Sequence, residues 1–247
     1  MLLEELPRIR ELRDLADNTG SRDAYFREFD DLVGNHPRVR QVWQARENEL
    51  TALDADAWDF LKNKIRPSLT SRDKRRGWSQ FFDTLNEARG YRYLKGIGCS
   101  RVRFITCEPG KKSESPDLEA DLDGARILCE VKTINISDEE ADARVSFNKV
   151  ITPTVDLEEG FFKKLAEVIQ KAKRQMHAYD PRSSTRRIVY LVVSFDDLLG
   201  DCKERFFAQL NRHLIENPVP GVELVVHNQK TPLNKAIKMT VGTVVNE

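Results

Sequence analysis

The sequence of 247 residues has little of what usually marks a cofactor site. Its four cysteines show neither a Cys-x-x-Cys pair nor a zinc-type spacing, so they predict reduced thiols and no disulfide framework. Its four histidines are isolated from one another in sequence and build no metal site of their own. The Gly96-Ile97-Gly98 segment lacks the third glycine and the preceding strand of a phosphate-binding loop. Nucleotide hydrolysis is therefore not expected.

Long apolar runs are also missing. No segment approaches the length that a bilayer-spanning helix needs, and the N-terminus, which is rich in Glu, Arg and Asp, differs from a signal peptide. We therefore expect a cytoplasmic protein with no membrane partner. The chain is long enough to bury a sizeable core and to form one large or two small domains.

The net charge is zero, but the charges are unevenly distributed. Residues 1–60 contain 8 basic and 14 acidic side chains, whereas residues 61–112 contain 14 and 4. Residues 113–142 contain 2 and 10, and residues 143–188 contain 10 and 5. This acidic segment between basic ones suits phosphodiester cleavage, in which Lys and Arg neutralise phosphates while carboxylates hold metal. Ordinary patchiness of a highly charged surface is the alternative.

The segment 115–133 predicts a β-hairpin. Asp123-Gly124 is a strong two-residue turn, because a type I′ turn needs positive φ at both central positions. With these two residues as the loop, the predicted cross-strand pairs are Leu122 with Ala125, Asp121 with Arg126, and Asp117 with Glu130. The two acids, Asp117 and Glu130, then become direct neighbours.

Alternation along the two strands predicts one apolar face and one charged face, since side chains two residues apart point the same way. The expected apolar face comprises Leu118, Ala120, Leu122, Ala125, Ile127, Cys129 and Val131. The expected charged face comprises Asp117, Glu119, Asp121, Arg126, Glu130 and Lys132, together with Leu128. Lys132 is therefore expected beside Glu130 on the same side of the sheet.

The facing acids distinguish two interpretations of this hairpin. An amphipathic hairpin with its charged face in water explains Asp121 opposite Arg126. It does not explain Asp117 opposite Glu130, because like charges directly across a β-ladder are destabilising unless a cation lies between them. Carboxylate oxygens suit a hard cation such as Mg²⁺ or Mn²⁺, which also binds substrate phosphates.

The Ser-Pro-Asp117 segment, the twelve-residue gap and the Glu130-Val-Lys132 segment together resemble the PD-(D/E)xK signature of the restriction-endonuclease-like nucleases. This resemblance implies an α/β fold in which helices flank a mixed β-sheet. It covers roughly residues 78–195. The chain also lacks the clustered C-terminal cysteine triplet of iron–sulfur members of the RecB-like group, so no such cluster is expected.

Two further sequence features resemble features of members of the same superfamily. The segment from Leu157 to Tyr179 has helical apolar periodicity, and Gln175 and Tyr179 are spaced like the Gln-x-x-x-Tyr pair of RecB-like members. A core-edge glutamine and a packing tyrosine are the alternative. Glu87, in the helix predicted between Gly77 and Leu94, stands where members of the family carry a further metal-binding glutamate. A solvated glutamate is the alternative there.

The predicted order of elements suggests two domains. Residues 1–70 read as a helical N-terminal domain, residues 67–77 as the linker, and residues 71–247 as a nuclease-like domain. The latter is expected to contain strands near 101–107, 187–195 and 222–227, helices at 157–179 and about 201–216, a long loop at 134–156 and an apolar run near 239–245. Such a mixture of strands and helices predicts a mixed sheet with helices on both faces.

These positions predict a divalent-metal-dependent nuclease. Asp117, Glu130 and the Val131 carbonyl are expected to hold Mg²⁺, with Mn²⁺ able to substitute, and Glu87 is a further candidate ligand. Lys132 is expected to orient the nucleophile and offset developing charge. By resemblance, Gln175 and Tyr179 would orient substrate or site groups.

The partner expected for such a site is nucleic acid. DNA is favoured and endonucleolytic cleavage is favoured, while RNA, cleavage from ends and a homodimer remain open. A catalytically inactive nucleic-acid-binding module and a helical protein-interaction protein are the rival classes.

Overall fold

The computed structural model describes residues 2–17, 25–74, 77–106, 115–134, 156–193 and 203–228. Within these residues the chain is an α/β protein with seven α-helices and one five-stranded sheet. It divides into two compact units, the first ending at Phe104 and the second beginning at Ile105. The first unit is longer than the helical domain predicted for residues 1–70, because the helix that follows the predicted linker packs against the N-terminal helices.

The first unit is mainly helical. Its elements are η1 (Leu2–Glu5), α1 (Pro7–Asp17), α2 (Phe29–Asn35), α3 (Pro37–Leu50), α4 (Ala55–Ile65), η2 (Arg66–Leu69), α5 (Ser79–Gly96) and β1 (Ser100–Phe104). Pro37 begins α3, where its missing N–H costs no helical hydrogen bond. The Asp54 carboxylate caps α4 by accepting a hydrogen bond of 2.9 Å from the Ala57 N–H.

A buried charge network joins α3 to α5 in this unit. Arg46 on α3 donates to Glu49 at 3.0 Å and to Asn86 on α5 at 2.9 Å. Arg89, also on α5, donates to both Glu49 carboxylate oxygens, at 3.0 and 2.9 Å. All four side chains are buried, so removal of either arginine would leave the Glu49 charge poorly compensated in the interior.

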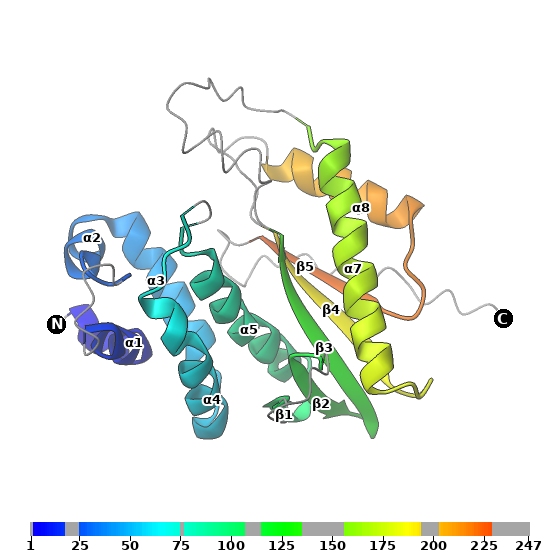
Figure 1. Cartoon of the computed structure of the whole chain (residues 1–247), viewed down its shortest axis with the longest axis horizontal. Helices are drawn as coiled ribbons and strands as arrows, with labels where there is room; N and C mark the ends of the chain where they lie inside the picture. Colours follow the sequence, from blue (N-terminus) through cyan, green and yellow to red (C-terminus); the bar gives the residue numbers. More distant parts are fainter. Residues whose placement is uncertain are drawn as a thin grey trace. The chain divides into compact units, whose positions relative to one another are not determined.

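The second unit contains most of the sheet. Its elements are β2 (Leu118–Leu122), β3 (Ala125–Ile134), α7 (Glu159–Tyr179), β4 (Arg186–Val193), α8 (Lys203–Glu216) and β5 (Glu223–Asn228). The strand order of the sheet is β1-β2-β3-β4-β5, with β2 antiparallel to β3, and β3, β4 and β5 parallel to one another (Figure 1). The sheet is therefore mixed, as the hairpin and the helix between β3 and β4 predicted.

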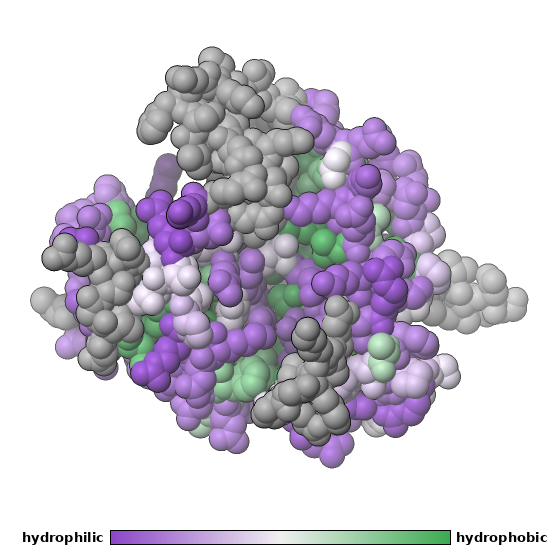
Figure 2. Space-filling model, in the orientation of Figure 1, coloured by the Kyte–Doolittle hydropathy of each residue, from purple (hydrophilic) through white to green (hydrophobic). Residues whose placement is uncertain are grey.

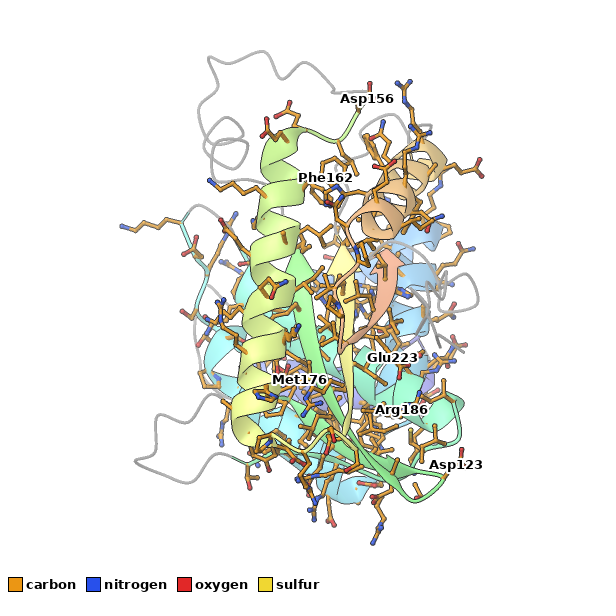
Figure 3. The ribbon with its side chains drawn as sticks, turned by 90° about the vertical axis from the view of Figure 1, so that its right-hand side faces the viewer. Asp123, Asp156, Phe162, Met176, Arg186 and Glu223 are labelled. Carbon is orange, nitrogen blue, oxygen red and sulfur yellow. The ribbon has the colours of Figure 1, made fainter. Side chains whose placement is uncertain are left out.

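The hairpin has the predicted turn and register. Asp123 and Gly124 both have positive φ, at 50° and 81°, as a type I′ turn requires. Leu122 pairs with Ala125, and each further pair runs one residue back on β2 and one residue forward on β3 as far as Leu118 and Cys129. The predicted pairing is confirmed over these five positions. Asp123 marks the tip of the hairpin in Figure 3.

Two helices cover one face of this sheet. The core of that layer contains Leu128, Ile134, Val189, Leu191, Val193, Leu224 and Val226 from the strands, Leu165, Ile169, Ala172 and Met176 from α7, and Phe206, Leu210 and Leu214 from α8. Figure 3 shows α7 lying along the strands, with Met176 in its C-terminal half. The helices predicted at 157–179 and about 201–216 are thus confirmed within two residues at each described boundary.

Two predicted segments fall mostly or wholly outside the part of the chain that the structure describes. Most of the loop predicted at 134–156 and all of the apolar run near 239–245 lie outside the described residues. In the ranges that are described, no helix combines the length and the apolar character that a membrane crossing requires. Figure 2 shows that the visible surface over α7 is mostly hydrophilic.

Candidate active site

Asp117 and Glu130 meet at the open end of the β2–β3 pair. The Asp117 N–H donates to the Glu130 Oε2 at 3.1 Å, and the Val131 N–H donates to the Asp117 Oδ2 at 2.9 Å. Each carboxylate therefore accepts a hydrogen bond from the backbone of the opposite segment. The Asp117 carbonyl also accepts a hydrogen bond of 3.0 Å from the Ile105 N–H, so both backbone polar groups of Asp117 are bonded.

Pro116 changes the ladder next to this pair. The β2–β3 pairing ends at Leu118 and Cys129; if the same register continued for two residues, Pro116 would lie opposite Val131. Both backbone groups of Val131 point toward the β2 edge, because a strand residue directs its N–H and its C=O to the same side. Proline has no N–H, so it cannot donate to the Val131 carbonyl. The local sequence thus directs a backbone oxygen and two carboxylates to one end of the hairpin.

The Lys132 ammonium contacts the Glu130 Oε1, on the same side of β3. Glu130 is only 1% exposed, whereas the Lys132 side chain is 27% exposed. Lys132 is therefore a cation beside the two acids, and it supplies part of the positive charge that the facing carboxylates need. The predicted position of Lys132 beside Glu130 on one side of β3 is thus confirmed, while the metal ion expected between the two acids stays a prediction.

The expected charged face of the hairpin is not a solvent-exposed face. Leu128 and Ile134 point to the same face of β3 as Glu130 and Lys132, and both lie in the core beneath α7. The apolar stripe of α7 requires a covered sheet face, and the parallel β3–β4 connection places the helix on this side. Glu130 is consequently carried into a largely apolar layer rather than into water.

Burial, followed by the negative charge of Asp117, raises the pKa of the Glu130 carboxyl to about 7. The Lys132 ammonium and the hydrogen bond from the Asp117 backbone act in the opposite direction but do not cancel the effect of burial. The pair therefore favours holding a proton on Glu130 when no stronger cation is bound.

This raised pKa predicts how stability depends on pH in the metal-free protein. The folded state binds a proton on Glu130 up to about pH 7, whereas the unfolded chain releases it near its ordinary value of 4.5. The free energy of unfolding should therefore fall as pH rises through this window. Chemical unfolding in a chelating buffer would measure it, and Glu130→Gln should remove this contribution to the slope. An identical slope in both proteins would contradict the assignment.

The structure separates the two residues of the Gln-x-x-x-Tyr pair. The Gln175 Nε2 donates to the Ser115 carbonyl at 2.5 Å, two residues before Asp117, so Gln175 holds the segment that carries the first acid. Tyr179 is 38% exposed, and its ring lies 5.4 Å from the Arg126 guanidinium, near the turn end of β3. Gln175 therefore joins the candidate site, while Tyr179 contacts a different part of the hairpin.

Glu87 lies on α5 in the first unit. Its Oε2 forms an ion pair of 2.8 Å with the Lys64 ammonium, and the residue is buried rather than solvated. The solvated glutamate of the alternative interpretation is therefore wrong. A role of Glu87 as a metal ligand stays a prediction.

The two carboxylates and the Val131 carbonyl are the groups at this site that could hold a cation. Among the described residues, no group of three or more His, Cys, Asp or Glu side chains forms a metal-binding cluster. Two carboxylates fit Mg²⁺ nevertheless, because this ion typically keeps several waters and binds through one or two carboxylates plus substrate phosphates. The oxygen donors also fit Mn²⁺.

A polar cluster at the C-terminal end of α7 was not predicted from the sequence. Asp180 is 3% exposed and accepts hydrogen bonds from Arg126 at 3.0 Å, from Arg182 at 2.8 Å and from Thr185 at 2.9 Å. Arg126 also donates to Glu119, its diagonal neighbour on β2, at 3.1 Å. The cluster ties the end of α7 to the hairpin. No spacing in the sequence links residues 126 and 180, so this contact had no signal there.

The chain was compared with known protein families, curated proteins and solved structures. No protein-family model, no curated protein and no solved structure matches the chain.

Proposed function

We propose that the protein is a divalent-metal-dependent nuclease, with DNA as the favoured substrate and internal phosphodiester bonds as the favoured target. On this proposal, the mixed sheet and its helices form a restriction-endonuclease-like fold. The observation that carries the proposal is the convergence of Asp117 and Glu130, each bonded to the backbone of the other's segment, beside Lys132.

The energetics of the two acids support a cation at this site. Two carboxylates side by side are unfavourable, and Glu130 is buried as well, so its charged form is costly in the absence of additional positive charge. One lysine compensates one of the two charges. The repulsion between the two carboxylates lowers the stability of the fold, and a divalent cation bound by both of them would offset this repulsion.

Asp117, Glu130 and the Val131 carbonyl would hold Mg²⁺ or Mn²⁺ in this proposal. A bound divalent cation supplies Lewis-acid stabilisation of the scissile phosphate and lowers the pKa of a bound water. Gln175 supports the site by holding the Ser115 backbone, and thus the position of Asp117. Gln175 is therefore a positioning residue.

On this proposal, Lys132 binds Glu130 in the metal-free protein and contacts the substrate phosphate in the metal-bound protein. In the metal-free protein its ammonium binds Glu130. With a divalent cation held by the two carboxylates, the Lys132 ammonium would be available to the nonbridging phosphate oxygens. There the compact ammonium orients the nucleophile and offsets charge that develops in the transition state.

A second candidate is a nucleic-acid-binding module without cleavage activity. The contact of Lys132 with Glu130 favours it, because the lysine partly neutralises the acids without a metal. Both candidates bind nucleic acid, so binding alone does not separate them.

Cleavage assays test the proposal directly. The wild-type protein should cut labelled DNA in Mg²⁺ and in Mn²⁺ and should cut nothing in chelator. Linear duplex, closed circular duplex, single-stranded DNA and RNA should be assayed in parallel, since cutting of circles shows internal cleavage. Metal-independent cutting would contradict the assigned chemistry. Binding of these substrates without cleavage in either metal would instead support the inactive module.

A further inference from the structure

Tyr179, the last residue of α7, carries an aromatic ring at the surface of the second unit. Of the phenylalanine, tyrosine and tryptophan residues in the described ranges, Tyr179 alone is exposed, at 38%. Exposure by itself implies no function, because single apolar side chains are common on protein surfaces. The way in which this ring is held distinguishes it.

The Arg126 guanidinium lies over the Tyr179 ring, 5.4 Å from the ring centre, which is within the range of a cation–π contact. This guanidinium is fixed at two further points, because it donates to Glu119 at 3.1 Å and to Asp180 at 3.0 Å. Both acids are buried. Tyr179 is therefore an exposed ring with a rigid support, and little side-chain freedom remains to be lost when a ligand stacks on it.

The supported ring lies on the same side of the hairpin as the acid pair. Arg126 and Glu130 point to the same face of β3, and the four residues between their positions span about 13 Å. On α7, Tyr179 follows Gln175 by about one turn, or about 6 Å along the helix axis. Gln175 in turn holds Ser115, two residues before Asp117.

We propose that the Tyr179 ring, supported by Arg126, stacks on an unpaired base of the nucleic-acid strand whose backbone reaches the acid pair. This inference rests on the proposed function, and it narrows the substrate to nucleic acid that is single-stranded at this point. Four nucleotides of one B-form strand rise about 13 Å, and an unstacked strand covers that distance with fewer.

The chemistry of the ring specifies what it recognises. Bases inside a duplex are stacked on both faces, whereas an unpaired base has a face free for an aromatic side chain. Every base has such a face, so the contact should tolerate any sequence. A neutral ring displaces no counterions, so its contribution to affinity should not depend on salt.

The test uses three single variants of the full chain. Tyr179→Ala removes the ring, Tyr179→Phe keeps it, and His177→Ala is the control, because His177 is exposed on α7 about 160° around the axis from Tyr179. Equilibrium binding of a labelled single strand of roughly 12 nucleotides, and of the duplex that contains it, is measured in chelator at several salt concentrations. Thermal unfolding of each variant confirms that it is folded.

Tyr179→Ala should weaken binding of the single strand by about tenfold, with an unchanged slope of log affinity against log salt. Its affinity for the duplex should stay within about twofold, since a stacked base offers no free face. Tyr179→Phe and His177→Ala should bind like wild type.

Three results would overturn the inference: no binding of the single strand by wild type, no loss in Tyr179→Ala, or an equal loss on single strand and duplex. The assay excludes metal and measures no cleavage. A protein that shows the expected losses but never cuts would therefore remove the nuclease proposal alone.

Discussion

Lys132→Ala should lose cleavage by at least about a hundredfold, because removal of a single group that stabilises transition-state charge costs about that much in other active sites. Asp117→Asn should lose at least as much, since it removes one of the two carboxylates that hold the cation. Initial rates on labelled DNA in Mg²⁺ measure both effects. A Lys132→Ala protein that cuts as fast as wild type would count strongly against the mechanism.

The matched control for Lys132→Ala is Lys163→Ala. Lys163 is exposed on α7 and is not part of the candidate site. Its loss should leave the rate within about twofold, because surface substitutions of this kind change free energies by a few tenths of a kcal/mol. Circular dichroism and thermal unfolding of each variant show whether a lost rate reflects chemistry rather than misfolding.

Asp180→Asn should destabilise the fold by about 3 kcal/mol. The substitution keeps the shape of the side chain but removes its negative charge. The carboxylate of Asp180 accepts hydrogen bonds from Arg126, Arg182 and Thr185. Hydrogen bonds to a charged group contribute about 1.5–3 kcal/mol each, and breaking a buried ion pair costs about 3–5 kcal/mol. The lower end of that range is expected because the Arg182 side chain is 62% exposed and its ion pair is therefore screened by water. Urea unfolding measures the change.

Asp156→Asn provides the comparison for that variant. Asp156 also binds an arginine, Arg205, at 2.8 and 2.9 Å, but both side chains are more than half exposed. An exposed pair of this kind contributes about 0–1 kcal/mol, so its loss should be small. Similar destabilisation by the two substitutions would show that burial of Asp180 has no special effect on its ion pairs.

The hairpin and its register were predictable because the information is local. The Asp123-Gly124 turn sets the pairing, and alternation then sets the two sides of each strand. This rule also placed Asp117 beside Glu130, although Asp117 lies one position beyond the last paired residue of β2. The resemblance to a nuclease signature added a chemical interpretation, but the juxtaposition follows from the turn alone.

The parts that the sequence could not predict depend on contacts between distant segments. Alternation shows that Glu130 and Leu128 share a face, but it does not show that a helix covers that face. Likewise, spacing puts Gln175 and Tyr179 on one side of α7, while their partners, Ser115 and Arg126, belong to different ends of the hairpin. The boundary of the first unit depends on the packing of α5, which the linker composition does not reveal.

The order of the strands has a consequence for how the site assembles during folding. The two acids are separated by thirteen residues across a tight turn, and hairpins of this kind close within about 1–10 μs. The parallel pairing of β3 with β4 must close a much longer stretch of chain, so it is slower to form. We therefore expect the acid pair to meet while it is still hydrated, and its electrostatic repulsion to become severe only when α7 covers this face of the sheet. Divalent ions present during folding should accelerate that last docking step.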